Sequence, residues 1–104
     1  MKGYKIVRNI KGKHYSFSFL VDGELRVEYK YRKATFPNGG KPPLFVFDSL
    51  SHAMEAYRLY SDVDIYQCSY KEYKGLLTPN IIYCGVTPEG TVLADSVTLL
   101  KLVK

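Results

Sequence analysis

The sequence predicts an α+β domain in which a mostly antiparallel, twisted sheet of about six to seven strands carries one main helix. Three observations predict this class: apolar and polar residues alternate over much of the N-terminal third, one later segment repeats its apolar residues with helical spacing, and turn signals separate short runs of strand-forming residues. The 104 residues are expected to form a single domain, 1–104, because a second independent core does not fit in this length.

The N-terminal third contains the clearest strand signals. Tyr4 to Asn9 predicts a first strand because Ile6 and Val7 are β-branched, and Lys11-Gly12-Lys13 then supplies a turn. Two alternating runs follow, and we expect the three strands to form a meander. The side chains expected on the inner face are Tyr15, Phe17, Phe19 and Val21 in the first run and Leu25, Val27, Tyr29 and Tyr31 in the second.

A hairpin between the two alternating runs is predicted around Asp22-Gly23-Glu24. A three-residue loop pairs Phe17 with Tyr29 and brings the apolar faces of both strands together. A two-residue Asp-Gly turn would instead pair Phe17 with Glu28, so burial favours the longer loop.

One segment has helical periodicity. It follows an exposed Gly- and Pro-rich loop at residues 37–43 and a short apolar run from Leu44 to Phe47, after which Asp48 or Ser49 can cap a helix. The helix is expected over about 50–60, with one apolar stripe and polar residues elsewhere. The stripe consists of Leu50, Ala53, Met54 and Tyr57.

Further strands are predicted in the C-terminal half. Residues Ser96 to Val103 are compatible with either a strand or a short helix, which Asp95 or Ser96 would cap. Their β-branched residues favour the strand. The other expected strands are Val63 to Tyr70, Ile81 to Val86 and Thr91 to Ala94, the last two joined by a type I turn at Thr87-Pro88-Glu89-Gly90.

Composition excludes several classes of protein. Apolar residues make up 46% and charged residues 24%, as in globular proteins and unlike disordered chains. Apolar runs are too short for a membrane helix and the start lacks a signal peptide, so we expect a cytoplasmic protein with no membrane partner. Cys68 and Cys84 are too few for a disulfide framework and are expected to be buried and reduced.

Candidate chemical motifs are weak. Gly39-Gly40-Lys41 lacks the helix that a phosphate-binding P-loop opens, because Pro42-Pro43 follows the lysine. The two histidines, His14 and His52, lack the close ligand spacing of a zinc site, so neither a metal nor a cofactor is expected. Asp62 and Asp64 share one face of a predicted strand, where solvated acids are more common than catalytic pairs.

Charge and tyrosine content provide the main functional signal. Residues 1–47 hold ten Lys or Arg against three acids, a net charge of +7, whereas the remainder holds five against seven, a net charge of −2. Ten tyrosines supply rings that stack on bases or cover protein surfaces. The candidate ligand-binding residues are Arg8, Arg26, Tyr29, Lys30, Tyr31, Arg32, Lys33 and Lys41.

Part of the chain resembles known proteins. Leu44-Phe45-Val46-Phe47-Asp48-Ser49, the helix after it and Val63-Asp64-Ile65-Tyr66-Gln67-Cys68 are similar to small uncharacterised prokaryotic and phage proteins. With the opening strand Tyr4-Lys5-Ile6-Val7-Arg8 they also distantly resemble ADP-ribosyltransferase-like domains. In that family an Arg or His of the first strand contacts NAD and a late Glu is catalytic. Arg8 matches the first position, whereas Glu89, in a predicted turn, does not match the second.

The leading functional hypothesis is a non-enzymatic binding module of prokaryotic or phage type. Its basic, tyrosine-rich surface or the Gly-Pro loop would contact a protein or a nucleic acid. The alternatives are an ADP-ribosyltransferase-like nucleotide-binding domain or enzyme, a nucleic-acid-binding protein, and a self-associating protein whose sheet edges pair. The sequence leaves the partner, catalytic activity, oligomeric state and strand order open.

Overall fold

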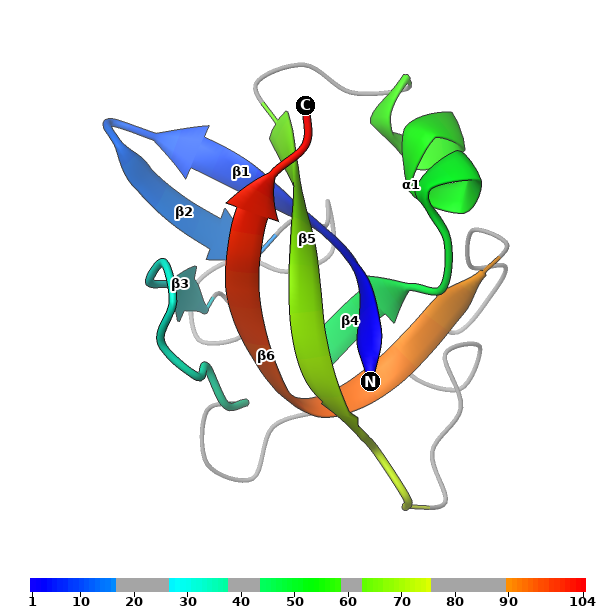
Figure 1. Ribbon diagram of the computed structural model, residues 1–104. Helices are drawn as coiled ribbons and strands as arrows, with labels where there is room; N and C mark the ends of the chain where they lie inside the picture. Colours follow the sequence, from blue (N-terminus) through cyan, green and yellow to red (C-terminus); the bar gives the residue numbers. More distant parts are fainter. Residues whose placement is uncertain (17–26, 38–43, 59–62, 76–89) are drawn as a thin grey trace.

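The computed structural model describes residues 1–16, 27–37, 44–58, 63–75 and 90–104. Within these residues the chain forms six strands and one helix (Figure 1), so the predicted α+β class is confirmed. All paired strands are antiparallel. In chain order the elements are β1 (Lys2–Ile10), β2 (Lys13–Ser16), β3 (Glu28–Tyr29), β4 (Leu44–Phe47), α1 (Leu50–Tyr57), β5 (Val63–Glu72) and β6 (Thr91–Leu102).

The sheet closes on itself into a small barrel. Its strand order is β3-β2-β1-β4-β6-β5, and an additional pairing joins β1 to β5. This pairing extends from Lys2 opposite Ser69 to Arg8 opposite Val63, while the other edge of β1 meets β4 where Tyr4 pairs with Phe47. Strands β1, β4, β6 and β5 therefore form a ring, and β2 and β3 extend it at one end (Figure 1).

The turn between β1 and β2 lies where the sequence predicts it. Ile10 pairs with Lys13, so Lys11 and Gly12 form a two-residue loop. Both loop residues have positive φ, 51° and 82°, as a type I′ turn requires. The side-chain oxygen of Asn9 accepts a hydrogen bond from the Gly12 amide at 3.2 Å and fixes the start of this turn.

The predicted register of the next hairpin is wrong. Tyr29 pairs with His14, not with Phe17, and Tyr15 pairs with Glu28. Tyr29 points into the barrel as predicted, but Tyr15 lies on the outer face, because the barrel interior accepts only one face of each strand. The loop expected at Asp22-Gly23-Glu24 lies outside the described residues, as do the loop at 38–43 and the strand expected at 81–86.

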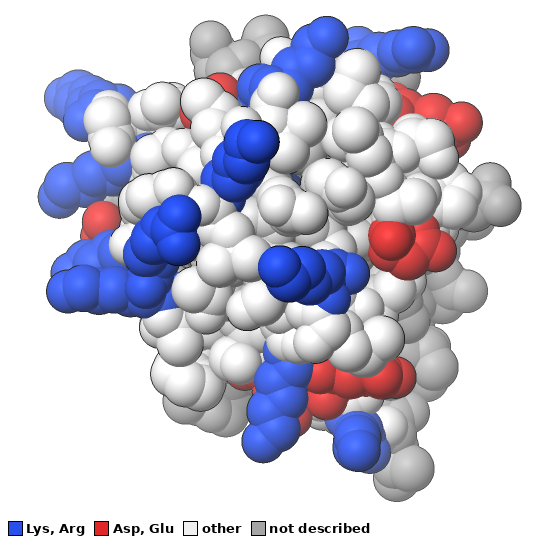
Figure 2. Space-filling view, in the orientation of Figure 1, with Lys and Arg blue, Asp and Glu red and all other residues white. Residues whose placement is uncertain are grey.

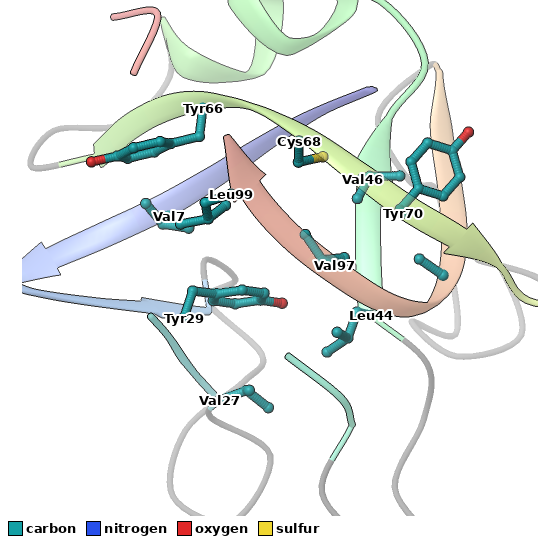
Figure 3. Packing of buried hydrophobic residues seen from close by; sticks show 11 residues of the cluster. Val7, Val27, Tyr29, Leu44, Val46, Tyr66, Cys68, Tyr70, Val97 and Leu99 are labelled. Carbon is teal, nitrogen blue, oxygen red and sulfur yellow. The ribbon is translucent and has the colours of Figure 1, made fainter. Parts of the chain in front are cut away.

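Two apolar clusters share the strands of the barrel. The inner cluster fills the barrel (Figure 3) and contains Val7, Val27, Tyr29, Leu44, Val46, Tyr66, Cys68, Tyr70, Ala94, Val97 and Leu99. The outer cluster joins α1 to the outside of the barrel and contains Ile6, Phe47, Ala53, Ala56, Val63 and Ile65. Ile6 and Val7 are consecutive and fall in different clusters, as alternation along a strand requires.

Helix α1 begins where it is predicted to begin. Ser49 is the N-cap, and its hydroxyl accepts a hydrogen bond from the His52 amide at 3.3 Å. Of the predicted stripe, Ala53 is buried and Met54 and Tyr57 pack against the outer cluster, but Leu50 is exposed. The described helix ends at Tyr57, and residues 59–60 lie outside the described part of the chain.

Strand β6 includes most of the segment from Ser96 to Val103, for which the sequence left both a helix and a strand possible. Residues Thr91–Leu102 form one strand of 12 residues, which confirms the strand prediction. Its first part pairs with β4 and its later part with β5, and a register shift at Lys71/Glu72 leaves Asp95 without a residue opposite it. Asp95 is therefore the extra residue of a β-bulge and not a helix cap. Such an extra residue lets a strand bend, and here it lies where β6 passes from pairing with β4 to pairing with β5. Among the described residues, no helix is long and apolar enough to cross a membrane.

Candidate functional site

The structure separates the predicted ligand-binding residues into four groups. Lys30, Tyr31, Arg32 and Lys33 are exposed directly after β3, and Arg8 is half-buried on the outer face of β1. Tyr29 belongs to the inner cluster, with only 1% of its surface exposed. Arg26 and Lys41 lie outside the described residues.

Residues 30–35 are held against the edge of β6. The Arg32 amide donates to the Leu99 carbonyl at 3.1 Å, and Thr35 and Val97 exchange two backbone hydrogen bonds at 2.8 and 2.9 Å. The Tyr31 hydroxyl also donates to the Leu100 carbonyl at 2.7 Å. The position of Tyr31 and Arg32 on the barrel is therefore determined by the backbone of a neighbouring strand.

Arg32 and Tyr31 form an exposed cation–aromatic pair. The guanidinium carbon of Arg32 lies 5.4 Å from the centre of the Tyr31 ring, and 50% of Tyr31 is exposed. Arg32 adopts a φ of 62°, in the left-handed region that costs a non-glycine residue roughly 1 kcal/mol. The fold thus places a planar cation and an aromatic ring together at the surface.

The Tyr31 ring continues into a row of side chains that runs to β5. Its centre lies 6.1 Å from that of Tyr66, which lies 5.2 Å from the His14 ring in an edge-on arrangement. His14 Nε2 lies 3.1 Å from the Tyr66 hydroxyl and 3.9 Å from Asp64 Oδ2. We call Arg32, Tyr31, Tyr66, His14 and Asp64 the aromatic row.

The electrostatics of the aromatic row keep Tyr66 neutral. Burial raises the pKa of its hydroxyl, and the charge of Asp64 and the proximity of Tyr31 raise it further. A neutral hydroxyl can donate to His14 Nε2 when the imidazole is neutral. In a catalytic triad the two ring nitrogens of the histidine face different partners, one the nucleophile and the other the acid. Here Nε2 of His14 faces both Tyr66 and Asp64, so the row does not have the geometry of a triad. Its chemistry is suited to stacking and hydrogen bonding.

Basic residues lie on the segments that carry the aromatic row and at the end of β6, where Leu102 pairs with Tyr66. Figure 2 shows Lys and Arg side chains gathered along the left edge of the molecule, where Figure 1 places the β1–β2 hairpin and β3. The basic residues of 8–16, 28–33, 63–66 and 101–104 are Arg8, Lys11, Lys13, Lys30, Arg32, Lys33, Lys101 and Lys104. The acids of these same ranges are Glu28 and Asp64. We call this region the basic end of the barrel, and it attracts anions.

Among the described residues, Lys5 is the one buried lysine, and it lies inside the barrel. Its ammonium group donates to the Phe45 carbonyl at 2.6 Å and lies 5.0 Å from the centre of the Tyr29 ring. Burial lowers the Lys5 pKa from 10.5 to about 8. Burial also raises the pKa of the Cys68 thiol to about 11, so this cysteine is neutral, as its predicted structural role requires. Neither group belongs to the exposed surface.

A second polar cluster lies at the start of α1. His52 Nδ1 lies 2.6 Å from Asp48 Oδ1 and 3.0 Å from the Ser49 hydroxyl. The hydrogen bond from His52 holds the pKa of the Asp48 carboxyl below its usual value. One ring nitrogen again serves both neighbours, so these residues support the helix cap and do not form a catalytic triad.

Other candidates from the sequence fall into different places. Cys84, Asp62 and Glu89 lie outside the described residues, so the ADP-ribosyltransferase resemblance at Arg8 stays a prediction. Within the described ranges no three His, Cys, Asp or Glu side chains are grouped as metal ligands.

His14, Asp64 and Tyr66 were not predicted as one site, because they come from strands that are distant in the sequence. Tyr66 and Asp64 are two residues apart on a strand, so their side chains share a face. This spacing is the one feature of the sequence that could have predicted that the two residues belong to the same site.

Comparison with models of known families, with curated proteins and with solved structures finds no significant match.

Proposed function

We propose that this protein is a binding module for single-stranded nucleic acid, and that the aromatic row and the basic end of the barrel form its binding surface. The observation that carries the proposal is the exposed Arg32–Tyr31 pair, with its ring 5.4 Å from the guanidinium, at the end of the barrel where basic residues gather. Single-stranded nucleic acids are bound by the same combination of stacking rings and backbone-neutralising cations.

The two halves of this surface have different tasks. Tyr31 offers a half-exposed ring on which a base stacks, and such stacking contributes about 1–3 kcal/mol per base. Lys30 and Lys33 flank the ring along the chain and are exposed, so they can follow the phosphates on either side of a stacked base. A cytoplasmic location belongs to the same proposal, because single-stranded nucleic acid is an intracellular ligand.

A titration of a fluorescein-labelled ten-nucleotide oligothymidylate, followed by fluorescence anisotropy, tests the proposal. We expect saturable binding that weakens as salt rises, with a logarithmic slope of about −0.7 for each phosphate neutralised. Tyr31→Ala should weaken binding roughly tenfold, since it removes one stacking ring.

Lys71→Gln provides the matched control. Lys71 is exposed and lies near the opposite end of β5 from Asp64, so its loss removes one positive charge without touching the aromatic row. Affinity should change less than twofold in this variant. Absence of salt-sensitive binding by the wild-type protein, or equal losses for Lys71→Gln and Tyr31→Ala, would contradict the proposal.

A further inference from the structure

Asp64 is an acid within a surface that otherwise attracts anions. Its side chain is 30% exposed at the end of the aromatic row. Its described contacts are with Asn9 Nδ2 at 3.5 Å and His14 Nε2 at 3.9 Å, and both involve the same carboxylate oxygen, Oδ2. A carboxylate here repels phosphate, so it weakens a surface whose only task is to hold a nucleic acid backbone.

One hydrogen bond, from Asn9 Nδ2 at 3.5 Å, engages one oxygen of the Asp64 carboxylate. Asn9 uses its side-chain oxygen to accept from the Gly12 amide at 3.2 Å, which leaves its side-chain nitrogen directed to Asp64. The Tyr66 hydroxyl lies 3.1 Å from the His14 nitrogen that faces the same carboxylate. A carboxylate acceptor beside a row of rings can select among bases and not only bind them.

An ionised carboxylate only accepts hydrogen bonds, and the bases differ in the donors that they present to it. Guanine carries two adjacent donors on its Watson–Crick edge, the N1–H and the N2 amino group, which match the two oxygens of a carboxylate. Adenine and cytosine present an amino group beside a ring-nitrogen acceptor, and thymine presents one N–H between two carbonyl oxygens. In single strands these edges are free to be read.

From this juxtaposition, and resting on the function proposed above, we infer that Asp64 makes the aromatic row selective for guanine. A guanine stacked at the row gives its two donors to the carboxylate. Any other base leaves the Asp64 charge only partly satisfied and close to the phosphates. The same residue therefore strengthens binding of one base and weakens binding of the others.

The test compares nine-nucleotide oligothymidylates that carry one central guanine, inosine, adenine or cytosine, by competition against the labelled oligothymidylate. We expect the guanine oligonucleotide to bind about tenfold more tightly than unsubstituted oligothymidylate, as one bidentate base contact provides. Inosine keeps the N1–H and lacks the N2 amino group, so its affinity should lie between the two. A single central guanine avoids the four-stranded assemblies of guanine runs.

Two charge-neutralising variants separate base selection from general electrostatics. Asp64→Asn should abolish the guanine preference and tighten the binding of plain oligothymidylate, because a repulsive charge is lost. Glu28→Gln is the matched control, since Glu28 is the other acid of the basic end and pairs with Tyr15 on the outer face. It should tighten binding of every oligonucleotide equally and keep the guanine preference.

The outcomes distinguish the two proposals. Failure of all oligonucleotides to bind contradicts the proposed function itself. Binding without preference for guanine, or a guanine preference that Asp64→Asn leaves intact, overturns the inference about Asp64 and leaves the binding module standing.

Discussion

Replacing Lys5 with methionine is expected to stabilise the protein near neutral pH. Only 4% of Lys5 is exposed, and its pKa falls from 10.5 to about 8 because the barrel removes its ammonium group from water. A pKa depressed by this amount corresponds to about 3 kcal/mol of stability lost below pH 8, where the folded state must hold the buried charge. Methionine has a similar length and no charge.

The pH dependence identifies the cause. Between pH 8 and 10.5 the unfolded state binds more protons at Lys5 than the folded state does, so stability rises with pH in this window. The wild-type protein should therefore gain roughly 1 kcal/mol between pH 7 and pH 9. Above pH 9 the Cys68 thiol acts in the opposite direction, because its pKa is raised from 9.0 to about 11 and the unfolded state loses this proton first.

Urea unfolding at pH 7, 8 and 9 measures both effects. Lys5→Met should be more stable than wild type at pH 7 by about 1–2 kcal/mol, after allowance for the lost hydrogen bond to Phe45, and should show a flat profile to pH 9. Lys2→Met is the control, since Lys2 is exposed on the same strand and should leave the pH profile unchanged. An equal rise in stability from pH 7 to 9 in Lys5→Met and wild type would show that Lys5 does not cause the pH dependence.

Three backbone predictions follow from single residues. Gly3→Ala should destabilise the protein by about 2 kcal/mol in urea unfolding, because its Cβ would lie 2.7 Å from the Phe47 carbonyl oxygen; a loss below 0.5 kcal/mol would contradict the close packing. Lys11→Asn should stabilise the first hairpin by roughly 0.5–1 kcal/mol, since Asn-Gly is the preferred type I′ pair and Lys11 has a φ of 51°; unchanged thermal unfolding would argue against this turn. Arg32→Gly should raise stability by roughly 1 kcal/mol, because it relieves a φ of 62°, and yet lower oligonucleotide affinity; a parallel loss of both would show that Arg32 acts on folding alone.

Local patterns predicted most of the elements. The β-branched start, the capped apolar stripe and the strand-forming C-terminal run identified β1, α1 and much of β6, because each signal lies within about ten residues. The hairpin register was wrong since local pairing ignored the barrel. Tyr29 is placed by burial in the inner cluster, and His14 becomes its partner as a result.

Long-range pairing determines what the sequence does not predict. The barrel closes through β1 and β5, and this closure brings Asp64 and Tyr66 to His14. The same closure turns Lys5 inward, although by composition it counts as one more residue of the basic half. The candidate surface was therefore predicted at Tyr31 and Arg32, where the residues are neighbours in sequence, whereas its continuation to His14 and Asp64 was not.

Amide NMR of the protein during titration with oligothymidylate, at low and at raised salt, shows whether single-stranded nucleic acid binds at the aromatic row. We expect shifts confined to the amides of Tyr31, Arg32, His14 and their neighbours, which shrink as salt rises. An unchanged spectrum at low salt, or shifts centred on the far end of β5 near Lys71, would contradict binding at the aromatic row.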